Sequence, residues 1–368
     1  MAGEIAAASR PDVKSLAATE LAAAFREWGE PAYRLRQLLD GLYRRRATEW
    51  GQLTDLPRRL RERLAERFTL QPLALERLQR EPDGATKFLW RLPDGEHIES
   101  VLLPANPALY GEGSDRRTLC VSTQVGCGFG CRFCASGLGG LRRNLLPFEI
   151  VEQVLAAERW RADQTAEPRP GRLIDNLVIM GMGEPFANYE RVLAALRILN
   201  APWGGSIGAR RITVSTCGLP HQIRRFAQEP EQFRLAISLH GAADAVRSRI
   251  MPVNKRYPLA ELLEACREYR RRKGKLLTLE YILIRGVNDA PDQAARLARI
   301  ARELRAKVNL IPYNPVPGLA WERPEPDRQK AFLHRIRAAG AAATLRREKG
   351  ASIQAACGQL RLRAETEP

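Results

Sequence analysis

The stretch Cys127-Gly-Phe-Gly-Cys131-Arg-Phe-Cys134 carries more information about fold and chemistry than any other part of this chain. Its spacing, C-x3-C-x2-C, puts three thiolates on one short loop, where they can hold three irons of a cubane [4Fe–4S] cluster. Such clusters usually take four cysteines. A cluster with three protein ligands keeps one iron open, as catalytic metal sites do. The loop therefore predicts a cluster that binds a small molecule and passes it an electron.

Two other uses of these cysteines fit the sequence less well. A structural zinc site needs a fourth ligand, often from a second Cys or His pair. No such pair is near, because the histidines are scattered at His97, His221, His240 and His334. A disulfide framework does not suit a chain of this length with dispersed cysteines and no recognisable signal peptide. The cluster is thus favoured over zinc or unligated thiols.

Length and composition indicate one large domain with a small one. The chain has 368 residues, 45% of them hydrophobic, enough for a sizeable core. No apolar run approaches the ~18–20 residues of a membrane span, and residues 1–8 lack the basic and apolar regions of a signal peptide. We therefore expect a cytoplasmic protein without membrane association, in a reducing compartment that suits an oxygen-sensitive cluster.

The charge balance points to a polyanionic partner. Lys and Arg number 59 against 42 Asp and Glu, which gives a net charge of +17 and a pI near 10.1. The basic runs, such as 44–46, 142–143 and 270–273, are spread along the chain. Because a GC-rich genome also enriches arginine, charge alone only favours nucleic acid binding.

The chain divides into four segments by pattern. Residues 15–68 show helical spacing with Pro31 and Pro57 as breaks, so residues 1–78 are predicted to form an N-terminal helical accessory domain. Alternating runs around Pro93-Asp94-Gly95 predict a β-hairpin within a linker at 79–112. The remainder is assigned to an α/β core at 113–345 and a C-terminal tail at 346–368.

Six β-rich runs alternate with helical patterns in the core. The runs are 119–122, 176–180, 211–215, 233–239, 277–284 and 307–311; the helical patterns include 147–161, 189–199, 259–273 and 292–304. This alternation predicts a parallel sheet with right-handed crossovers. Six units favour an open, partial (β/α)6 barrel over a closed one of eight, with active residues at the carboxyl ends of the strands.

Polar loops follow these strands. They are Gly181-Met-Gly-Glu-Pro185, Ser215-Thr-Cys-Gly218, Ser238-Leu-His240-Gly and Ile311-Pro-Tyr-Asn-Pro315. Glycine lets the backbone approach a ligand, and the Glu184 carboxylate can hold an ammonium group. Each loop alone is ordinary, but four in phase beside a cluster loop predict a ligand site.

Together these runs resemble a known family. Thr118–Cys127, Gly181–Pro185, Arg210–Gly218, Ala236–His240, Asn309–Pro315 and Ala355–Leu360 are similar to the dual-specificity 23S rRNA and tRNA adenine-C2 methyltransferases of the radical S-adenosylmethionine (SAM) class. The similarity runs in order from about Leu21 to Arg363 and includes two cysteines outside the cluster loop. It implies a partial (β/α)6 radical SAM barrel with a small N-terminal accessory domain and a C-terminal catalytic tail.

The resemblance also implies cofactors and their ligands. The [4Fe–4S] cluster would be held by Cys127, Cys131 and Cys134. SAM would be bound by residues at the strand ends, namely Gly183, Glu184, Ser215, Ser238, Leu239, His240 and Asn314. Partners implied are 23S rRNA at the peptidyl transferase centre, tRNA at position 37, and an electron donor such as flavodoxin, with the enzyme itself a monomer.

The implied chemistry uses both outer cysteines. Cys357 would be methylated by a first SAM, and a second SAM would yield a 5′-deoxyadenosyl radical that takes hydrogen from that methyl group. The resulting methylene radical would add to C2 of adenine, an electron-poor carbon that polar methyl transfer cannot attack. Cys120 would release the protein–RNA adduct through a transient disulfide with Cys357, and Glu99 matches a proton acceptor.

Several alternatives stay open at this point. Cys357 could be a small packed residue of the Ala-rich tail, and Glu99 an exposed strand carboxylate; Cys217 and Cys266 are taken as structural. Rival functions are C8 methylation of the same ribosomal adenine, a radical SAM enzyme without an RNA substrate, and a non-catalytic RNA-binding protein with a structural cluster. Pro185 and the 311–315 run favour the C2 enzyme by resemblance. Gln354 stands where the family often has an acid, and a long segment between Glu99 and Cys120 blurs the placement of Glu99.

Overall fold

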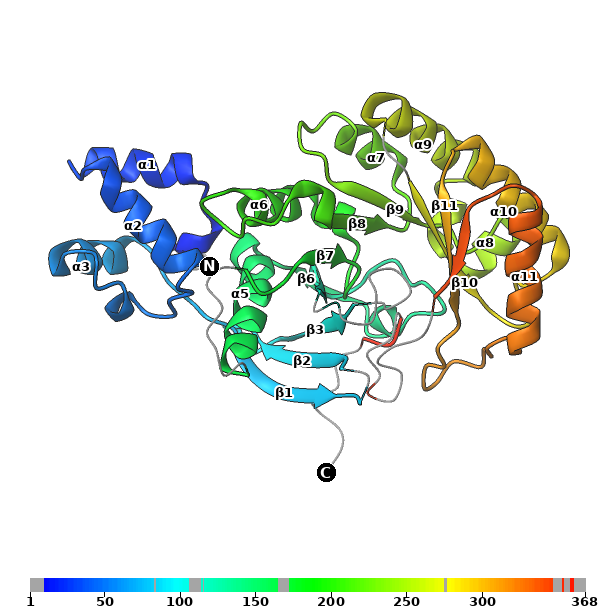
Figure 1. Ribbon diagram of the computed structural model, residues 1–368, viewed down its shortest axis with the longest axis horizontal. Coiled ribbons are helices and arrows are strands. Elements are labelled where there is room, and N and C mark those ends of the chain that lie inside the picture. Colours follow the sequence, from blue (N-terminus) through cyan, green and yellow to red (C-terminus); the bar gives the residue numbers. More distant parts are fainter. Residues whose placement is uncertain are drawn as a thin grey trace, which may run out of the picture.

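The computed structural model describes residues 10–82, 84–105, 114, 116–164, 172–274, 277–346, 353 and 358–360. Figure 1 shows a helical unit at one side of a curved sheet, with helices along the outer side of that curve. Cys357 lies outside the described residues, so its predicted role is not tested by its own position.

The N-terminal unit is helical, as predicted. It contains α1 (Ala18–Glu27), α2 (Ala32–Tyr43) and α3 (Arg58–Arg67), with 3-10 turns η1 (Val13–Ser15) and η2 (Trp50–Gln52). Pro31 and Pro57 stand at the N-caps of α2 and α3. A proline is tolerated there because the first turn of a helix has no partner for its backbone N–H. The two breaks in the sequence pattern are thus helix starts.

Buried ion pairs attach this unit to helix α5 (Pro147–Asp163) of the core. The Lys14 ammonium donates to a Glu152 carboxylate oxygen at 2.7 Å and to the Gln71 carbonyl at 2.8 Å. Arg46 pairs with Glu158 at 2.9 Å. Because Lys14 and Glu152 are both fully buried, their contact is shielded from water and salt.

Replacing Lys14 with methionine should lower stability by about 3 kcal/mol, because it leaves a buried carboxylate without one of its cations. The remaining partner, Arg159, limits the loss. Urea unfolding followed by circular dichroism measures the effect. The matched control is Arg58→Met, since Arg58 pairs with Glu62 on the exposed face of α3 and should leave the midpoint unchanged. Equal midpoints for the two variants would contradict this account of the attachment.

One ten-stranded sheet forms the framework, in the order β1-β2-β3-β4-β7-β8-β9-β10-β11-β12. The first part is antiparallel and contains β1 (Ala74–Arg80), β2 (Thr86–Arg91) and β3 (His97–Pro104), the last pairing with β4 (Arg117–Cys120). The β2–β3 pair confirms the predicted hairpin. The boundary proposed at residue 78 falls inside β1.

The second part of the sheet is parallel. It runs through β4, β7 (Asn176–Ile179), β8 (Ile212–Thr216), β9 (Arg234–Ser238), β10 (Thr278–Leu283), β11 (Lys307–Pro312) and β12 (Ala343–Leu345). The six predicted strands are all present. A short seventh strand, β12, extends them, and among the described residues the two edge strands do not pair, so the barrel is open.

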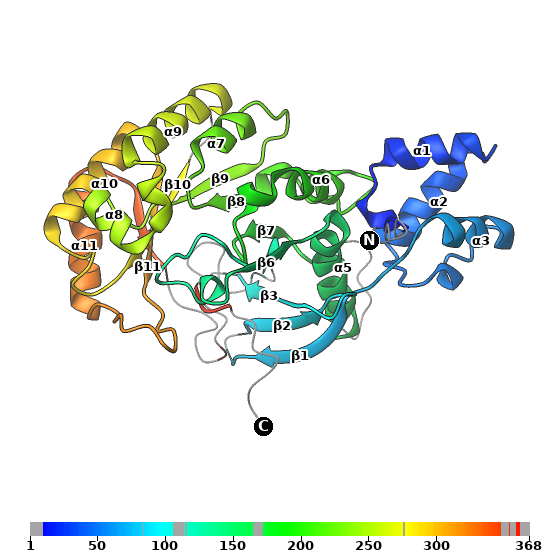
Figure 2. The same cartoon turned by 180° about the vertical axis from the view of Figure 1, so that it is seen from behind.

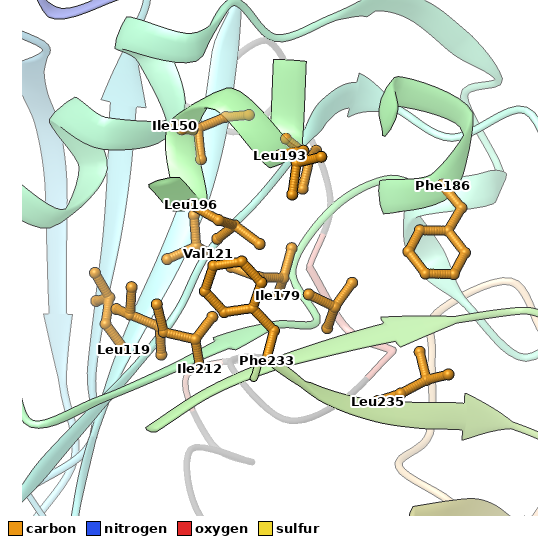
Figure 3. Packing of buried hydrophobic residues seen from close by; sticks show 14 of the residues in the cluster. Leu119, Val121, Ile150, Ile179, Phe186, Leu193, Leu196, Ile212, Phe233 and Leu235 are labelled. Carbon is orange, nitrogen blue, oxygen red and sulfur yellow. The ribbon is translucent and has the colours of Figure 1, made fainter. Parts of the chain in front are cut away.

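Helices cover the outer face of the parallel strands. They are α5, α6 (Tyr189–Asn200), α7 (Pro220–Phe226), α9 (Leu259–Lys273), α10 (Pro291–Glu303) and α11 (Pro326–Ala338), while the short helix α8 (Asp244–Ile250) lies by the ends of β8 and β9. Figure 3 shows the core between strands and helices, where Leu119 and Ile179 approach Ile150 and Leu196. This packing leaves the concave side of the sheet for other contacts. No described helix has the length and apolar character to cross a membrane.

Candidate active site

The cysteine loop joins two short strands, β5 (Gln124–Gly126) and β6 (Leu141–Asn144). Gly126 has φ +74°, and a Cβ there would lie 2.0 Å from the Gly140 carbonyl oxygen, so only glycine fits. Backbone bonds hold the loop: Cys127 N–H donates to Gly140 O at 2.9 Å, and Arg132 N–H donates to Ile250 O of α8 at 2.9 Å. The loop is therefore shaped by its backbone, without using the thiols.

All three thiols line one cavity with about 950 Å³ of empty space. Burial raises the pKa of Cys127 to about 12 and that of Cys131 well above its usual value; repulsion from neighbouring thiolates and Glu184 adds to both shifts. Deprotonating such a group requires a strong local positive charge, which bound iron supplies.

The spread of the thiols fits a cluster better than a single ion. Within the described part of the chain, no three His, Cys, Asp or Glu side chains converge as ligands of one metal ion. A cubane attaches each thiolate to a different iron. Three cysteines around one cavity therefore match the predicted [4Fe–4S] ligands Cys127, Cys131 and Cys134.

Most of the expected SAM residues meet in this cavity. Its wall includes Gly183, Glu184, Ser215, Ser238 and His240, which come from the carboxyl ends of β7, β8 and β9. The Ser215 and Ser238 hydroxyl oxygens lie 3.3 Å apart. The other two expected residues, Leu239 and Asn314, are buried but are not among the residues that line the cavity. Leu239 is buried, with its N–H donating to Glu280 O at 3.0 Å, and the Asn314 side-chain oxygen accepts from Arg323 at 2.7 Å.

Glu184 connects two strand ends. Its carboxylate accepts from Phe186 N–H at 2.9 Å and from Cys217 N–H at 2.7 Å, while its own N–H donates to the Gln124 side chain at 2.8 Å. Burial raises its pKa, against the lowering effect of these hydrogen bonds. A ligand ammonium would supply the charge that this buried carboxylate needs.

Gly183, next to this carboxylate in the cavity wall, packs closely against Gln124. It has φ +101°, and a Cβ there would lie 2.6 Å from the Gln124 Cβ. Only glycine therefore fits at this point of the wall.

The buried side chain of Arg247 donates hydrogen bonds to the backbone at the ends of β8 and β9. This fully buried guanidinium donates to Cys217 O at 2.5 Å, to Leu239 O at 3.0 Å and to the Asn254 side-chain oxygen at 2.8 Å. It thereby ties the ends of β8 and β9 to α8. Sequence reasoning missed it, because nothing in its local pattern distinguishes it from the many surface arginines.

Glu280 and Cys217 also line the cavity and were not assigned to it. Glu280 is buried, burial raises its pKa, and it accepts from the Asn309 side chain at 2.7 Å. Its signal in the sequence is an acid inside the apolar run 277–284, on the same strand face as Ile282. Cys266, taken as structural, is indeed buried in the core.

His240 is held as a neutral hydrogen-bond acceptor. It adopts φ +55°, its Nδ1 accepts from Ile282 N–H at 3.0 Å, and its carbonyl accepts from the Asn288 side chain at 2.8 Å. Phe133 of the cysteine loop meets its ring edge-on, with centroids 4.7 Å apart. Burial lowers the pKa of His240 to about 3, and the Arg247 charge adds to this effect.

His240 should therefore stay neutral throughout the working pH range. The pKa of His240 falls from 6.5 to about 3 on folding, so that as pH drops the unfolded chain takes up a proton on this residue before the folded chain does. The free energy of unfolding therefore decreases as pH drops from about 6.5 toward 3. Nitrogen NMR of the imidazole at pH 5 should show the neutral form. The His240→Asn variant should lose less stability than the native chain over this range. A protonated ring at pH 5 would contradict this environment.

Cys120 lies in a second hollow beside the main cavity, which we call the Cys120 hollow. It has about 470 Å³ of empty space, and its wall includes Val101, Cys120 and Gly358. It shares Cys134 and Gly358 with the main cavity. The two spaces therefore share a wall.

The end of the chain returns to this wall. Ala135 N–H donates to Gly358 O at 2.7 Å, and the Ser136 hydroxyl donates to Leu360 O at 2.8 Å. Residues 358–360 are thereby tied to the loop that follows the cluster cysteines. Gly358 is the residue after Cys357 in the sequence.

Glu99 is a buried strand residue, so the alternative of an exposed carboxylate is wrong. It is 4% exposed and pairs with the Lys87 ammonium of β2 at 3.0 Å. It shares a face of β3 with Val101, two residues on, which lines the Cys120 hollow. Glu99 is thus directed to the same side of the sheet as Cys120.

Comparison with known proteins agrees with this geometry. Residues 121–298 match the radical SAM superfamily model, and residues 12–70 match the ribosomal RNA large subunit methyltransferase N-terminal domain. The chain is 50% identical to a probable dual-specificity RNA methyltransferase RlmN 3 of Opitutus terrae, covering 98% of this chain and 96% of that one. It is 47% identical to the dual-specificity RNA methyltransferase RlmN of Anaeromyxobacter dehalogenans, over 95% and 91%.

A solved structure is similar over almost the whole chain. The crystal structure of a radical SAM methyltransferase from Sphaerobacter thermophilus superposes with a TM-score of 0.87 at 46% identity, covering 95% of this chain and 99% of that one. Radical SAM proteins use a [4Fe–4S] cluster and SAM, which the cavity residues fit. This chain is an enzyme of the radical SAM superfamily and belongs to the RlmN family of dual-specificity RNA methyltransferases.

Proposed function

We propose that this enzyme methylates C2 of adenine, in 23S rRNA at the peptidyl transferase centre and in tRNA at position 37, by way of a methyl group carried on Cys357. Each methylation would consume two SAM. The observation that carries the proposal is the wall shared by the main cavity and the Cys120 hollow, with Gly358 lining both. The covalent and the radical chemistry would thus take place in adjoining spaces.

The cavity residues have distinct tasks in this proposal. When bound, the cluster and SAM together supply an electron, a methyl group and a carbon radical able to remove hydrogen from a methyl group. Cys127, Cys131 and Cys134 hold the cluster. Glu184 would receive the ammonium of SAM, and Gly183 lies beside it in the cavity wall.

The Cys120 hollow is suited to a step that must exclude water. Val101, Leu360 and Met182 pack around Cys120 as a small apolar cluster. C2 of adenine has no nucleophilic electron pair, so it must be attacked by a carbon radical on the Cys357 sulfur. The adduct radical would then lose one electron, which the cluster can take back, and its C2 proton, which Glu99 would accept. The Cys120 thiolate would attack the Cys357 sulfur, so that a transient Cys120–Cys357 disulfide forms while the bond between sulfur and the methylene carbon breaks. The methylene carbon would keep that electron pair and take a proton to become the methyl group, and the disulfide would be reduced by two electrons from the reductant before the next turnover.

The remaining parts of the proposal concern RNA and its delivery. The N-terminal domain, proposed at 1–78, would contact RNA phosphates through its basic residues, which position a substrate without reading its sequence. The hairpin segment 79–112 and the core 113–345 would present the site, and the tail 346–368 would carry Cys357. The target adenine must leave its stack to enter. Substrate RNA and reductant both place the reaction in the cytoplasm, where we propose that the enzyme acts as a monomer.

Peptide mass spectrometry tests the carrier step without any RNA. Reconstituted enzyme incubated anaerobically with SAM and reductant should acquire one methyl group on the peptide that contains Cys357. The Cys357→Ala variant should acquire none and should form no methylated RNA. Methylated RNA from the Cys357→Ala variant would overturn the proposed route.

A further inference from the structure

A separate hollow lies on the other side of the cysteine loop, and we call it the outer hollow. It has about 870 Å³ of empty space and is lined by Cys131, Arg132, Leu138, Arg249 and Trp321, among others. The loop of residues 127–140 lies against α8 here, since Arg132 N–H donates to Ile250 O at 2.9 Å. Cys131 lines both the outer hollow and the main cavity. One cluster ligand therefore separates the SAM cavity from this second opening.

The rim of the outer hollow carries positive charge that no ion pair within the described part of the chain neutralises. Arg132 and Arg249 are exposed, and no carboxylate among the described residues forms an ion pair with either. Arginines nearby in the sequence behave differently: Arg142 pairs with Glu96 at 2.7 Å, and Arg143 is paired too. The one acid beside Trp321, Glu322, pairs with Arg285 at 3.1 Å. Two guanidinium groups are thus available to an acidic partner.

The same loop and the strand that follows it expose apolar side chains. Leu138 is 47% exposed, and Leu141, at the start of β6, is 46% exposed; both are among the few large hydrophobic side chains that the described part of the chain leaves to solvent. Apolar side chains flanked by charges are typical of a protein interface. An RNA surface would match the arginines but not the leucines.

The proposed reaction requires a partner at such a place. Each reductive cleavage of SAM consumes one electron, which must reach the cluster from outside. Electron transfer falls steeply with distance, so the donor gains most by docking in an opening that a cluster ligand lines. Cys131 is the cluster cysteine that lines the outer hollow, so a carrier docked there approaches the cluster through this residue.

We propose that the outer hollow is the docking site of a small acidic one-electron carrier protein. Arg132 and Arg249 pair with its carboxylates, and Leu138 contacts the apolar surface around its redox group. One electron passes to the cluster by way of Cys131; the carrier is oxidised by one electron and the cluster is reduced by one. This inference rests on the proposed radical function and identifies a partner for it.

Stopped-flow reduction of the reconstituted enzyme tests the docking site directly. The probe is fully reduced flavodoxin, an acidic carrier, and the signal is the visible absorbance of the cluster. The double variant Arg132→Glu/Arg249→Glu should be reduced at least tenfold more slowly than the native enzyme, and its rate should lose its salt dependence. Its iron content and its reduction by dithionite should be unchanged, because a small reductant needs no docking site.

The matched control is Arg299→Glu/Arg335→Glu, which makes the same change in net charge on exposed faces of α10 and α11. It should be reduced by flavodoxin at the native rate. Arg132 lies between two cluster cysteines, so its replacement could impair cluster loading. In that case Arg249→Glu/Leu138→Ser gives the same test with both changes outside the 127–134 run of cluster cysteines.

Failure of the docking site and failure of the proposed methyltransferase function would give different results. Equal flavodoxin rates for the outer-hollow variants and the control would overturn the docking site. Unchanged flavodoxin rates with weakened RNA binding would assign this face to RNA instead. Normal, docking-dependent cluster reduction without any methylated adenine would keep the docking site and overturn the proposed function.

Discussion

Replacing Cys131 with alanine should give a folded protein without an iron–sulfur cluster and without methyltransferase activity. The loop around Cys131 is held by backbone bonds, including Cys134 N–H to Cys131 O at 3.0 Å, which alanine preserves. The substitution removes one of three thiolates, and two cannot hold three irons of a cubane. Iron content and visible absorbance after reconstitution should fall to background, and SAM should no longer be cleaved to 5′-deoxyadenosine.

Cys266→Ala is the matched control for this variant. Cys266 is fully buried in the core on α9 and lines neither the main cavity nor the Cys120 hollow nor the outer hollow. Its replacement should therefore lower the free energy of unfolding modestly and leave the cluster in place. A Cys131→Ala protein with native iron content, or a Cys266→Ala protein without iron, would show that the cluster is held differently from the arrangement argued above.

Replacing Cys120 with alanine should stop turnover at a covalent protein–RNA adduct. Cys120 is 9% exposed at the end of β4, among apolar side chains, and its hollow adjoins Gly358. If its thiol is what releases the methylated base from Cys357, alanine leaves the preceding bond intact. A denaturing gel should show a slow band that disappears with either ribonuclease or protease.

Two further variants sharpen this result. Cys120→Ala/Cys357→Ala should form no adduct, since the attacking sulfur is absent, and Cys266→Ala should release product normally. Free methylated RNA from Cys120→Ala at the native rate would assign the release step to another group. Such a result would leave Cys120 as a packing residue of the hollow.

Much of the fold could be predicted because parallel strands buried on both faces are continuous apolar runs. The structure has β10 at Thr278–Leu283 within the predicted run 277–284. The edge strands were missed for physical reasons. β1 is mostly exposed and contains several charged residues, so its strand structure depends on pairing with β2. β12 follows an Ala-rich stretch, and alanine has low strand propensity.

The site was predictable where its signal is local. The three cysteines lie within eight residues, and Glu184 lies in the glycine-containing loop that follows a strand. Arg247, Glu280 and Lys87 act through contacts between distant segments, which no spacing reveals. The burial of Glu99 was missed for the same reason, because it depends on the ion pair with Lys87 and on the pairing of the hairpin with β4 of the core.

The identity of the methylated carbon separates the C2 enzyme from its C8 relative, and it can be read from the nucleosides of the product RNA. The reconstituted enzyme is incubated with SAM, reductant and a 23S rRNA fragment, and the digested nucleosides are identified by mass spectrometry against synthetic standards. The expected product is 2-methyladenosine. The appearance of 8-methyladenosine in its place, or of no methylated base while SAM is still cleaved, would contradict the proposed function.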